Sequence, residues 1–238
     1  MKTYSDFVQY YEDIFPFREK TYFFLKNYLL PDFNSILDIG CGTGVYISKF
    51  GLVTEYALGI DSDAEMISYA KDNYPGAEFR KMDMMQIQSL NTNFDLIYSI
   101  GNVIPHIPKE LLEKLAEQIY GNLKSGGRFI FQTVNWDSVL EKGLKKFKVI
   151  EKREKSLKFY REYRNITKEK ITFYLRLEKS DKIIFEEEQF LFPAPAEEYI
   201  KIFTSAGFTL KDHLGNFEKN PFEKLSSPAN IFVFEKTK

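Results

Sequence analysis

The sequence predicts a doubly wound α/β fold, in which a mostly parallel, seven-stranded sheet carries an antiparallel β insert. Over residues 35–133, short apolar strands alternate with helices across short turns, which is typical of a parallel sheet covered on both faces. Over residues 147–191, Phe, Tyr, Ile and Lys occur in near-alternating order, which is typical of antiparallel strands with one solvated face. We therefore expect a core of residues 1–137 and 193–238, with an insert of residues 138–192.

Proline, glycine and turn residues divide the chain into its expected elements. Residues 10–30 have helical spacing that Pro16 interrupts and Pro31 ends, and Ser62 or Asp63 is suited to cap the helix that follows the second strand. The other expected helices cover residues 45–50, 63–73, 109–123 and 196–206. The expected core strands cover residues 35–39, 56–60, 78–81, 94–99, 128–133, 208–214 and 231–235. Turn signals at residues 168–169 and 180–181 divide the insert into three or four strands.

Composition excludes several classes of protein. The chain has 238 residues, of which 44% are apolar and 28% charged, enough for a core and a polar surface. One cysteine cannot form an internal disulfide or a multi-cysteine zinc site, and no cluster of histidines and acids indicates a metal. The apolar runs are far shorter than the roughly 20 residues of a membrane helix, and residues 1–12 lack a signal-peptide pattern. We expect a cytoplasmic protein with no metal and no membrane partner.

The net charge of −1 hides a basic segment. Residues 142–182 contain 15 Lys and Arg against six Asp and Glu. Such a segment either attracts an anionic partner, such as RNA, or is the solvated face of a sheet. The alternation with apolar residues favours the solvated face, so a nucleic-acid partner is not favoured but stays open.

A glycine-rich turn joins the first strand to its helix and predicts a site for a ligand. Such a turn lets backbone amides approach the ligand, and the following helix N-terminus favours anionic groups. The turn reads GxGxG over residues 40–44, and Val45 stands where the dinucleotide-binding pattern GxGxxG requires its third glycine. The longer run ILDIGCGTG, residues 36–44, resembles motif I of the class I S-adenosylmethionine-dependent methyltransferases, whose fold is Rossmann-like.

This resemblance implies S-adenosylmethionine as cofactor and assigns residues to it. Asp61, at the end of the second strand, would accept hydrogen bonds from both ribose hydroxyls, and Asp38 would orient the methionyl amino group. Asp83 would lie beside the adenine amino group. The other residues assigned to the cofactor are Gly40, Gly42, Gly44, Ser62, Met66, Met84 and Ile100. A helix cap for Asp61, a loop acid for Asp83 and core packing for Met66 are the structural alternatives.

The loop after the fourth strand resembles one branch of this methyltransferase class. Residues 101–106 read GNVIPH, and this Gly-Asn-x-x-x-His order is similar to that of the glycine and sarcosine N-methyltransferases. Asn135 lies in an Asn-Trp-Asp stretch where those enzymes have Asn-Tyr-Asp. Their N-terminal arginine corresponds to Arg18, which would pair with the methionyl carboxylate, although a surface salt bridge is an equal alternative. The motif resemblance covers residues 10–137.

Methyl transfer from a sulfonium is an in-line displacement, so an enzyme mainly aligns the reactants and excludes water. His106 is the titratable group best suited to act as a base, and it has a structural alternative as a histidine near a proline turn. Asn102 and Tyr11 complete the expected catalytic set. Asn135, Arg161 and Arg164 are the expected substrate-binding residues. An acceptor carboxylate would be faced by Arg161, Arg164 or Arg176, and strand alternation means that some of these arginines point to solvent instead.

Three functions remain open at this point. The first is a methyltransferase that acts on a nitrogen or oxygen of a small molecule, with the insert as a lid over the carboxyl ends of the parallel strands. The second modifies RNA or protein and docks through residues 142–182. The third is a catalytically silent scaffold that binds the cofactor. The sequence does not name the acceptor, and a homodimer is left open. Replacing residues 145–185 with a Gly/Ser linker is expected to keep cofactor binding and abolish transfer.

Overall fold

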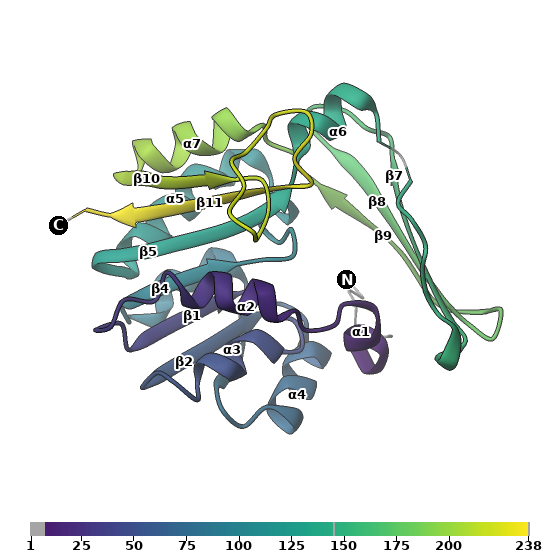
Figure 1. Cartoon of the computed structure of the whole chain (residues 1–238), viewed down its shortest axis with the longest axis horizontal. Coiled ribbons are helices and arrows are strands. Elements are labelled where there is room, and N and C mark those ends of the chain that lie inside the picture. Colours follow the sequence, from purple (N-terminus) through teal and green to yellow (C-terminus); the bar gives the residue numbers. More distant parts are fainter. Residues whose placement is uncertain (1–7, 145, 238) are drawn as a thin grey trace.

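The computed structural model describes residues 8–144 and 146–237 and contains two β-sheets (Figure 1). The first sheet has seven strands in the order β10-β11-β5-β4-β1-β2-β3, and the second has four in the order β6-β7-β8-β9. The predicted doubly wound core and antiparallel insert are confirmed. Residues 1–7 of the predicted core lie outside the described residues.

The strands of the large sheet are β1 (Ser35–Ile39), β2 (Tyr56–Asp61), β3 (Glu78–Lys81), β4 (Phe94–Ser99), β5 (Leu123–Val134), β10 (Phe208–Leu214) and β11 (Ala229–Lys236). Strands β1 to β5 pair in parallel, whereas β11 is antiparallel to both β5 and β10. The carboxyl ends of β1, β2 and β4 therefore meet at one edge, which is where ligands bind in open α/β sheets.

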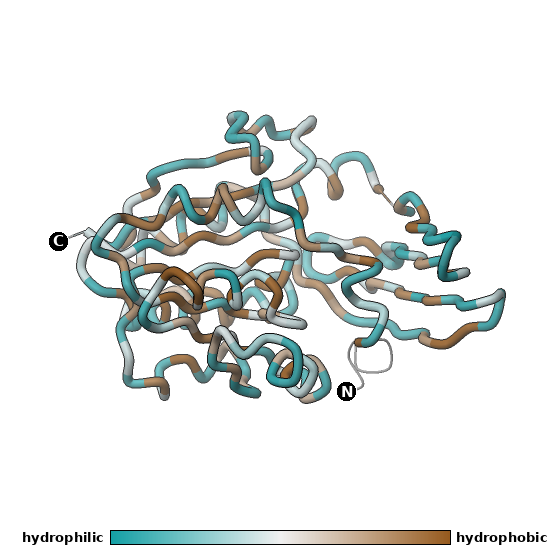
Figure 2. Tube along the Cα trace, turned by 60° about the horizontal axis from the view of Figure 1, so that its bottom comes forward, coloured by the Kyte–Doolittle hydropathy of each residue, from teal (hydrophilic) through white to brown (hydrophobic). Residues whose placement is uncertain are grey.

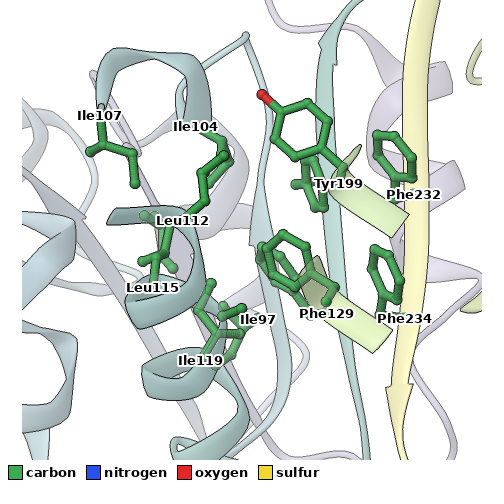
Figure 3. Packing of buried hydrophobic residues seen from close by; sticks show 14 of the residues in the cluster. Ile97, Ile104, Ile107, Leu112, Leu115, Ile119, Phe129, Tyr199, Phe232 and Phe234 are labelled. Carbon is green, nitrogen blue, oxygen red and sulfur yellow. The ribbon is translucent and has the colours of Figure 1, made fainter. Parts of the chain in front are cut away.

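Helices cover both faces of this sheet because neighbouring strand residues point to opposite sides. On one face, Ile97 and Phe129 pack with α5 (Leu112–Gly121) and α7 (Ala196–Ser205), as Figure 3 shows. On the other, Leu96 and Tyr98 pack with α2 (Glu19–Lys26), α3 (Val45–Phe50) and α4 (Ala64–Asn73). Both faces of the central strands are thus buried, which explains their continuous apolar sequence.

The second sheet contains β6 (Ile150–Lys152), β7 (Leu157–Arg164), β8 (Ile171–Lys179) and β9 (Lys182–Leu191). It projects from the core, and polar and apolar residues alternate along it (Figure 2). One face buries Phe159, Leu175 and Phe185 against Ile14 of α1 (Val8–Ile14). Helix α1 therefore lies between the projecting sheet and the core (Figure 1).

Two local predictions differ from the structure, and two elements were not predicted. The expected helix over 109–123 is a 3₁₀ turn, η4 (Lys109–Leu111), followed by α5, and residues 125–127 lie inside β5 instead of ending a helix. A helix, α6 (Trp136–Lys142), and a 3₁₀ helix, η2 (Met84–Leu90), were not expected. Each begins at a side-chain cap, Asn135 and Asp83 respectively. In both cases the cap was interpreted as a ligand-binding residue.

Candidate active site

A cavity of about 470 Å³ lies at the carboxyl ends of β1, β2 and β4. Its floor includes Gly40 and Gly42 of the glycine turn, and its opposite wall includes Gln189, Phe190 and Phe192 from the end of β9. The core and the projecting sheet therefore both contribute to one enclosed space.

The glycine turn is held by hydrogen bonds to the end of β2. The amides of Gly40 and Cys41 donate to the Ile60 carbonyl at 2.8 and 3.0 Å, and the Gly42 amide donates to Asp61 Oδ2 at 2.9 Å. Gly42 has a φ of +54°, in the left-handed region that glycine adopts without strain. A Cβ at Gly42 would lie 3.5 Å from the Tyr11 ring, which places this ring directly over the turn.

Asp61 is fixed by two backbone amides. Its Oδ1 accepts from the Asp63 amide at 2.9 Å, in addition to the bond between Oδ2 and Gly42. Burial raises the pKa of the Asp61 carboxyl, and the two amide donors partly offset this. The helix cap is supplied by Asp63, which accepts from the Glu65 and Met66 amides. Asp61 is thus not the cap of α4, and its carboxylate lines the cavity.

The structure also brings together the residues expected around an adenine ring. Asp83, Met84, Met66 and Ile100 all line the same cavity as Asp61, and so does Ser62. Asp83 caps η2 by accepting from the Met85 amide at 2.8 Å through Oδ1. One oxygen of Asp83 therefore has the structural role that was the alternative to adenine binding. The carboxylate nevertheless remains exposed at the cavity wall.

Asp38 lies behind the glycine turn and not in the cavity lining. It is 2% exposed, and its Oδ1 has no hydrogen-bond partner within residues 8–144 and 146–237. Burial raises the pKa of this carboxyl to about 8, although the adjacent Tyr98 hydroxyl lowers it, and the nearby negative charge of Asp61 raises it further. A buried acceptor without a partner is uncommon in folded proteins. This atom is suited to receive the N–H of an ammonium group.

His106 enters the cavity from the short 3₁₀ helix η3 (Ile104–His106). Burial lowers the pKa of its imidazole to about 4, so His106 is neutral at pH 7. The neighbouring Pro105 carbonyl accepts a hydrogen bond from the Phe192 amide at 2.7 Å. This bond ties the end of β9 to the loop after β4 and closes the cavity over the sheet edge.

Several predicted site residues lie elsewhere. Gly44 is the N-cap of α3 and packs against Phe79. Arg18 is exposed, and its backbone amide donates to the Tyr46 hydroxyl at 3.1 Å. Asn102 Oδ1 accepts from the Val134 amide at 2.9 Å, outside the cavity lining. None of these three residues lines the cavity, so the roles assigned to them from the sequence stay predictions.

The expected substrate-binding residues are also engaged elsewhere. Asn135 is 2% exposed, caps α6 and donates to the carbonyls of Lys224 and Ser227. Arg164 pairs with Glu188 at 2.7 Å and Glu162 at 3.3 Å. Arg161 donates to the Lys148 carbonyl at 3.4 Å and lies over the Phe147 ring. None of the three lines the cavity, and each side chain is held by other partners.

Sequence reasoning missed the wall that β9 provides. Gln189, Phe190 and Phe192 lie more than 80 residues from His106 in the chain, and no local motif marks them. Their only signal was the position of the insert after the fifth strand. That position predicted a lid but could not identify which strand end would form it.

Comparison with known proteins gives the site a family context. Residues 36–127 match the family model for a methyltransferase domain. Protein 235L of Invertebrate iridescent virus 6, whose name describes a methyltransferase, is 38% identical over 80 residues, which cover 32% of this chain and 29% of that protein. The match thus spans less than a third of that curated relative.

Solved structures share the whole fold. A S-adenosylmethionine-dependent methyltransferase from Clostridium acetobutylicum has a TM-score of 0.82 at 19% identity, covering 99% of each chain. The sugar N-methyltransferase KedS8 from Streptoalloteichus has a TM-score of 0.72 at 18% identity, covering 100% of this chain and 94% of that one. The amino pentose methyltransferase CalS10 from Micromonospora echinaspora, bound to S-adenosylmethionine, has a TM-score of 0.70 at 15% identity, covering 96% of each chain.

The chain's own residues fit this cofactor. The turn leaves its backbone open at Gly42, the Asp61 carboxylate lines the cavity, and Asp38 Oδ1 is a buried acceptor without a partner in the part of the chain described. Within the described residues, no helix is long and apolar enough to cross a membrane. The expected cytoplasmic location and homodimer stay predictions.

Proposed function

We propose that this protein transfers a methyl group from S-adenosylmethionine to a nitrogen or oxygen of a small molecule. The observation that carries the proposal is a single cavity that joins the glycine turn and Asp61 to a wall of Gln189, Phe190 and Phe192. When bound, the cofactor supplies a methyl group already activated by a positively charged sulfur. The chain then has to bind, align and exclude water.

The residues divide these tasks. Asp61 would hold the ribose hydroxyls, Asp83 the adenine amino group and Asp38 the methionyl ammonium group. Tyr11, Phe190 and Phe192 enclose the opposite side of the cavity and reduce access of water. Such enclosure favours methyl transfer because it keeps water away from the reacting atoms.

His106 is better suited to position the acceptor than to carry its proton. A base is most effective when its pKa lies near the working pH, whereas burial lowers the pKa of His106 to about 4. A neutral imidazole still offers one ring nitrogen as a hydrogen-bond acceptor. His106 would therefore orient an N–H or O–H group toward the methyl group, and the proton would leave to solvent.

The geometry supports a small acceptor over RNA or protein. The basic segment 142–182 pairs with acids of its own sheet, including Arg164 with Glu188 and Lys158 with Asp181. Strand β9 adds two further glutamates, Glu186 and Glu187, beside it. The names of KedS8 and CalS10 describe sugar methyltransferases, and the glycine and sarcosine resemblance also involves small amines. These observations support a small-molecule acceptor.

The proposal is tested by measuring S-adenosylhomocysteine formation with amines, amino acids, phenols and bulk RNA as acceptors. Turnover of small amines or phenols would support the proposal. Salt-sensitive turnover of RNA alone would instead support docking through residues 142–182. Binding of S-adenosylmethionine without turnover of any acceptor would support the silent scaffold.

A further inference from the structure

The cavity as a whole has an unusual charge balance for a site that was expected to hold an acceptor carboxylate. The charged residues that line it, within the described chain, are Asp61, Asp63 and Asp83, and none is Lys or Arg. A carboxylate or phosphate placed there would lose water without gaining a cation. The lining therefore disfavours an anionic group next to the reacting atom.

The same lining favours a cation or a hydrogen-bond donor. Tyr11 and Phe192 contribute aromatic rings to the lining, and the faces of such rings attract organic cations. The ring of Phe190, which also lines the cavity, already carries the Lys170 ammonium 4.2 Å from its centre. The three aspartates add negative charge to the space. An amine is therefore a better match than a phenol, whose reactive form is an anion that nearby carboxylates destabilise.

The arginines expected to hold an acceptor carboxylate do not compensate. Arg164 lies 3.6 Å from the centre of the Tyr174 ring and pairs with Glu188, on the face of the second sheet away from Gln189. Arg176 lies over Tyr160 and pairs with Glu178 at 3.0 Å. Both guanidinium groups are held within the sheet.

Gln189 supplies the polar atom on this wall. It lies on β9 opposite Phe173, is 3% exposed and lines the cavity. Its Nε2 donates to Glu187 Oε2 at 3.4 Å, which orients the amide and leaves Oε1 as the acceptor. Oε1 has no hydrogen-bond partner within residues 8–144 and 146–237. The terminal amide torsion of Gln is soft, so this oxygen can rotate toward a ligand in the cavity that Gln189 lines.

We propose that the acceptor is an organic amine with no carboxylate or phosphate near its reacting nitrogen, and that Gln189 Oε1 accepts an N–H of that amine. The inference rests on the proposed methyl transfer and names its substrate class. The nitrogen lone pair forms the new N–C bond while the electron pair of the S–C bond returns to sulfur. The methylated ammonium then releases its proton to water.

The first test uses matched acceptors that differ in one group. Tyramine, tyrosine and 4-methylphenol share a ring, and ethanolamine and phosphoethanolamine differ by a phosphate. The measurement is S-adenosylhomocysteine formation by the full chain. We expect amines without an anion to be turned over with a kcat/KM at least about tenfold above their anionic partners.

Three results would overturn this inference. Equal or better turnover of tyrosine or phosphoethanolamine would show that the cavity accepts an anion. Turnover of 4-methylphenol alone would refute an amine acceptor but leave the proposed function standing. No turnover of any nitrogen or oxygen compound, with S-adenosylmethionine bound, would refute the proposed function as well.

The second test replaces Gln189 with Met, which keeps the length and removes the acceptor oxygen. We expect KM for the amine that wild type turns over to rise about tenfold, with little change in S-adenosylhomocysteine affinity. Glu188→Gln, one residue away on the opposite face, is the matched control and should leave KM unchanged. An unchanged KM in Gln189→Met would contradict the role of Gln189.

A third variant separates recognition from folding. Gln189→Glu keeps an acceptor oxygen at this position and should retain amine turnover where Gln189→Met loses it. If thermal melting shows that Gln189→Met is unfolded, amine turnover by Gln189→Glu alone tests the role of Gln189. Loss of amine binding in a folded Gln189→Glu protein would overturn the assignment.

Discussion

At the scale of single residues, Asp61 combines a structural and a binding role. Its two oxygens clamp the Gly42 and Asp63 amides while the carboxylate lines the cavity. We expect Asp61→Ala to weaken S-adenosylhomocysteine binding about tenfold or more, because a charge-assisted hydrogen bond contributes on the order of 1.5–3 kcal/mol. Isothermal titration calorimetry measures the affinity. Asp72→Asn, on the exposed side of α4, is the control, and equal affinities in all three proteins would reject the assignment.

Because the Asp38 carboxyl is buried, we expect it to release a proton when the cofactor binds. Because burial raises its pKa to about 8, this carboxyl is mostly protonated at pH 7. An ammonium group beside Oδ1 would lower that pKa, so binding should release up to about one proton. Calorimetry in buffers of different ionisation enthalpy measures the proton count. We expect Asp38→Asn to abolish the release, and a wild-type count of zero at pH 7 would contradict the assigned contact.

His106 predicts a pH dependence of stability. Its pKa is about 4 in the folded protein and near 6.5 in the unfolded chain, so the unfolded chain binds more protons between these values. The free energy of unfolding should therefore decrease as the pH falls from about 6.5 to about 4. Urea unfolding of wild type and His106→Gln across this range measures the difference. If the two curves stayed parallel, His106 would not be buried as a neutral group.

At the scale of elements, two glycines of the same turn should respond differently to alanine. A Cβ at Gly44 would lie 2.4 Å from the buried Phe79 ring, whereas a Cβ at Gly42 would lie 3.5 Å from Tyr11, an ordinary contact. Both have positive φ, which costs about 1–2 kcal/mol for a non-glycine residue. Urea unfolding should show a greater loss of stability in Gly44→Ala than in Gly42→Ala. Equal losses of stability in the two variants would mean that backbone strain alone, and not the contact with Phe79, determines the effect of alanine.

The strands and the glycine turn could be predicted because their signals are local. Apolar runs and turn residues define β1 to β4. The positions of Asp61 and Asp83 at the ends of β2 and β3 follow from the same alternation of strands and helices. Asn135 and Arg18 could not be placed, because their partners lie on distant segments or in solvent. Gln189 was missed for the same reason: only tertiary packing brings β9 beside η3.

At the scale of the whole molecule, the structure changes the expected result of removing the insert. Residues Ile14 and Phe15 pack on the projecting sheet, and Tyr11 of the same segment lies over Gly42. Replacing residues 145–185 with a Gly/Ser linker would expose these apolar side chains and release Tyr11. We now expect loss of methyl transfer together with cofactor binding weakened about tenfold. Transfer at the wild-type rate in the shortened protein would show that the second sheet is not part of the site.

The central claim is that one cavity, between the glycine turn and the end of β9, binds S-adenosylmethionine beside its acceptor. A crystal structure with S-adenosylhomocysteine tests it most directly. We predict the ribose on Asp61, the adenine among Asp83, Met66 and Met84, and the sulfur facing His106 and Gln189. Density for the ligand at another site, such as the hollow beside Gln118 and Asn122 at the opposite edge of the sheet, would contradict the account.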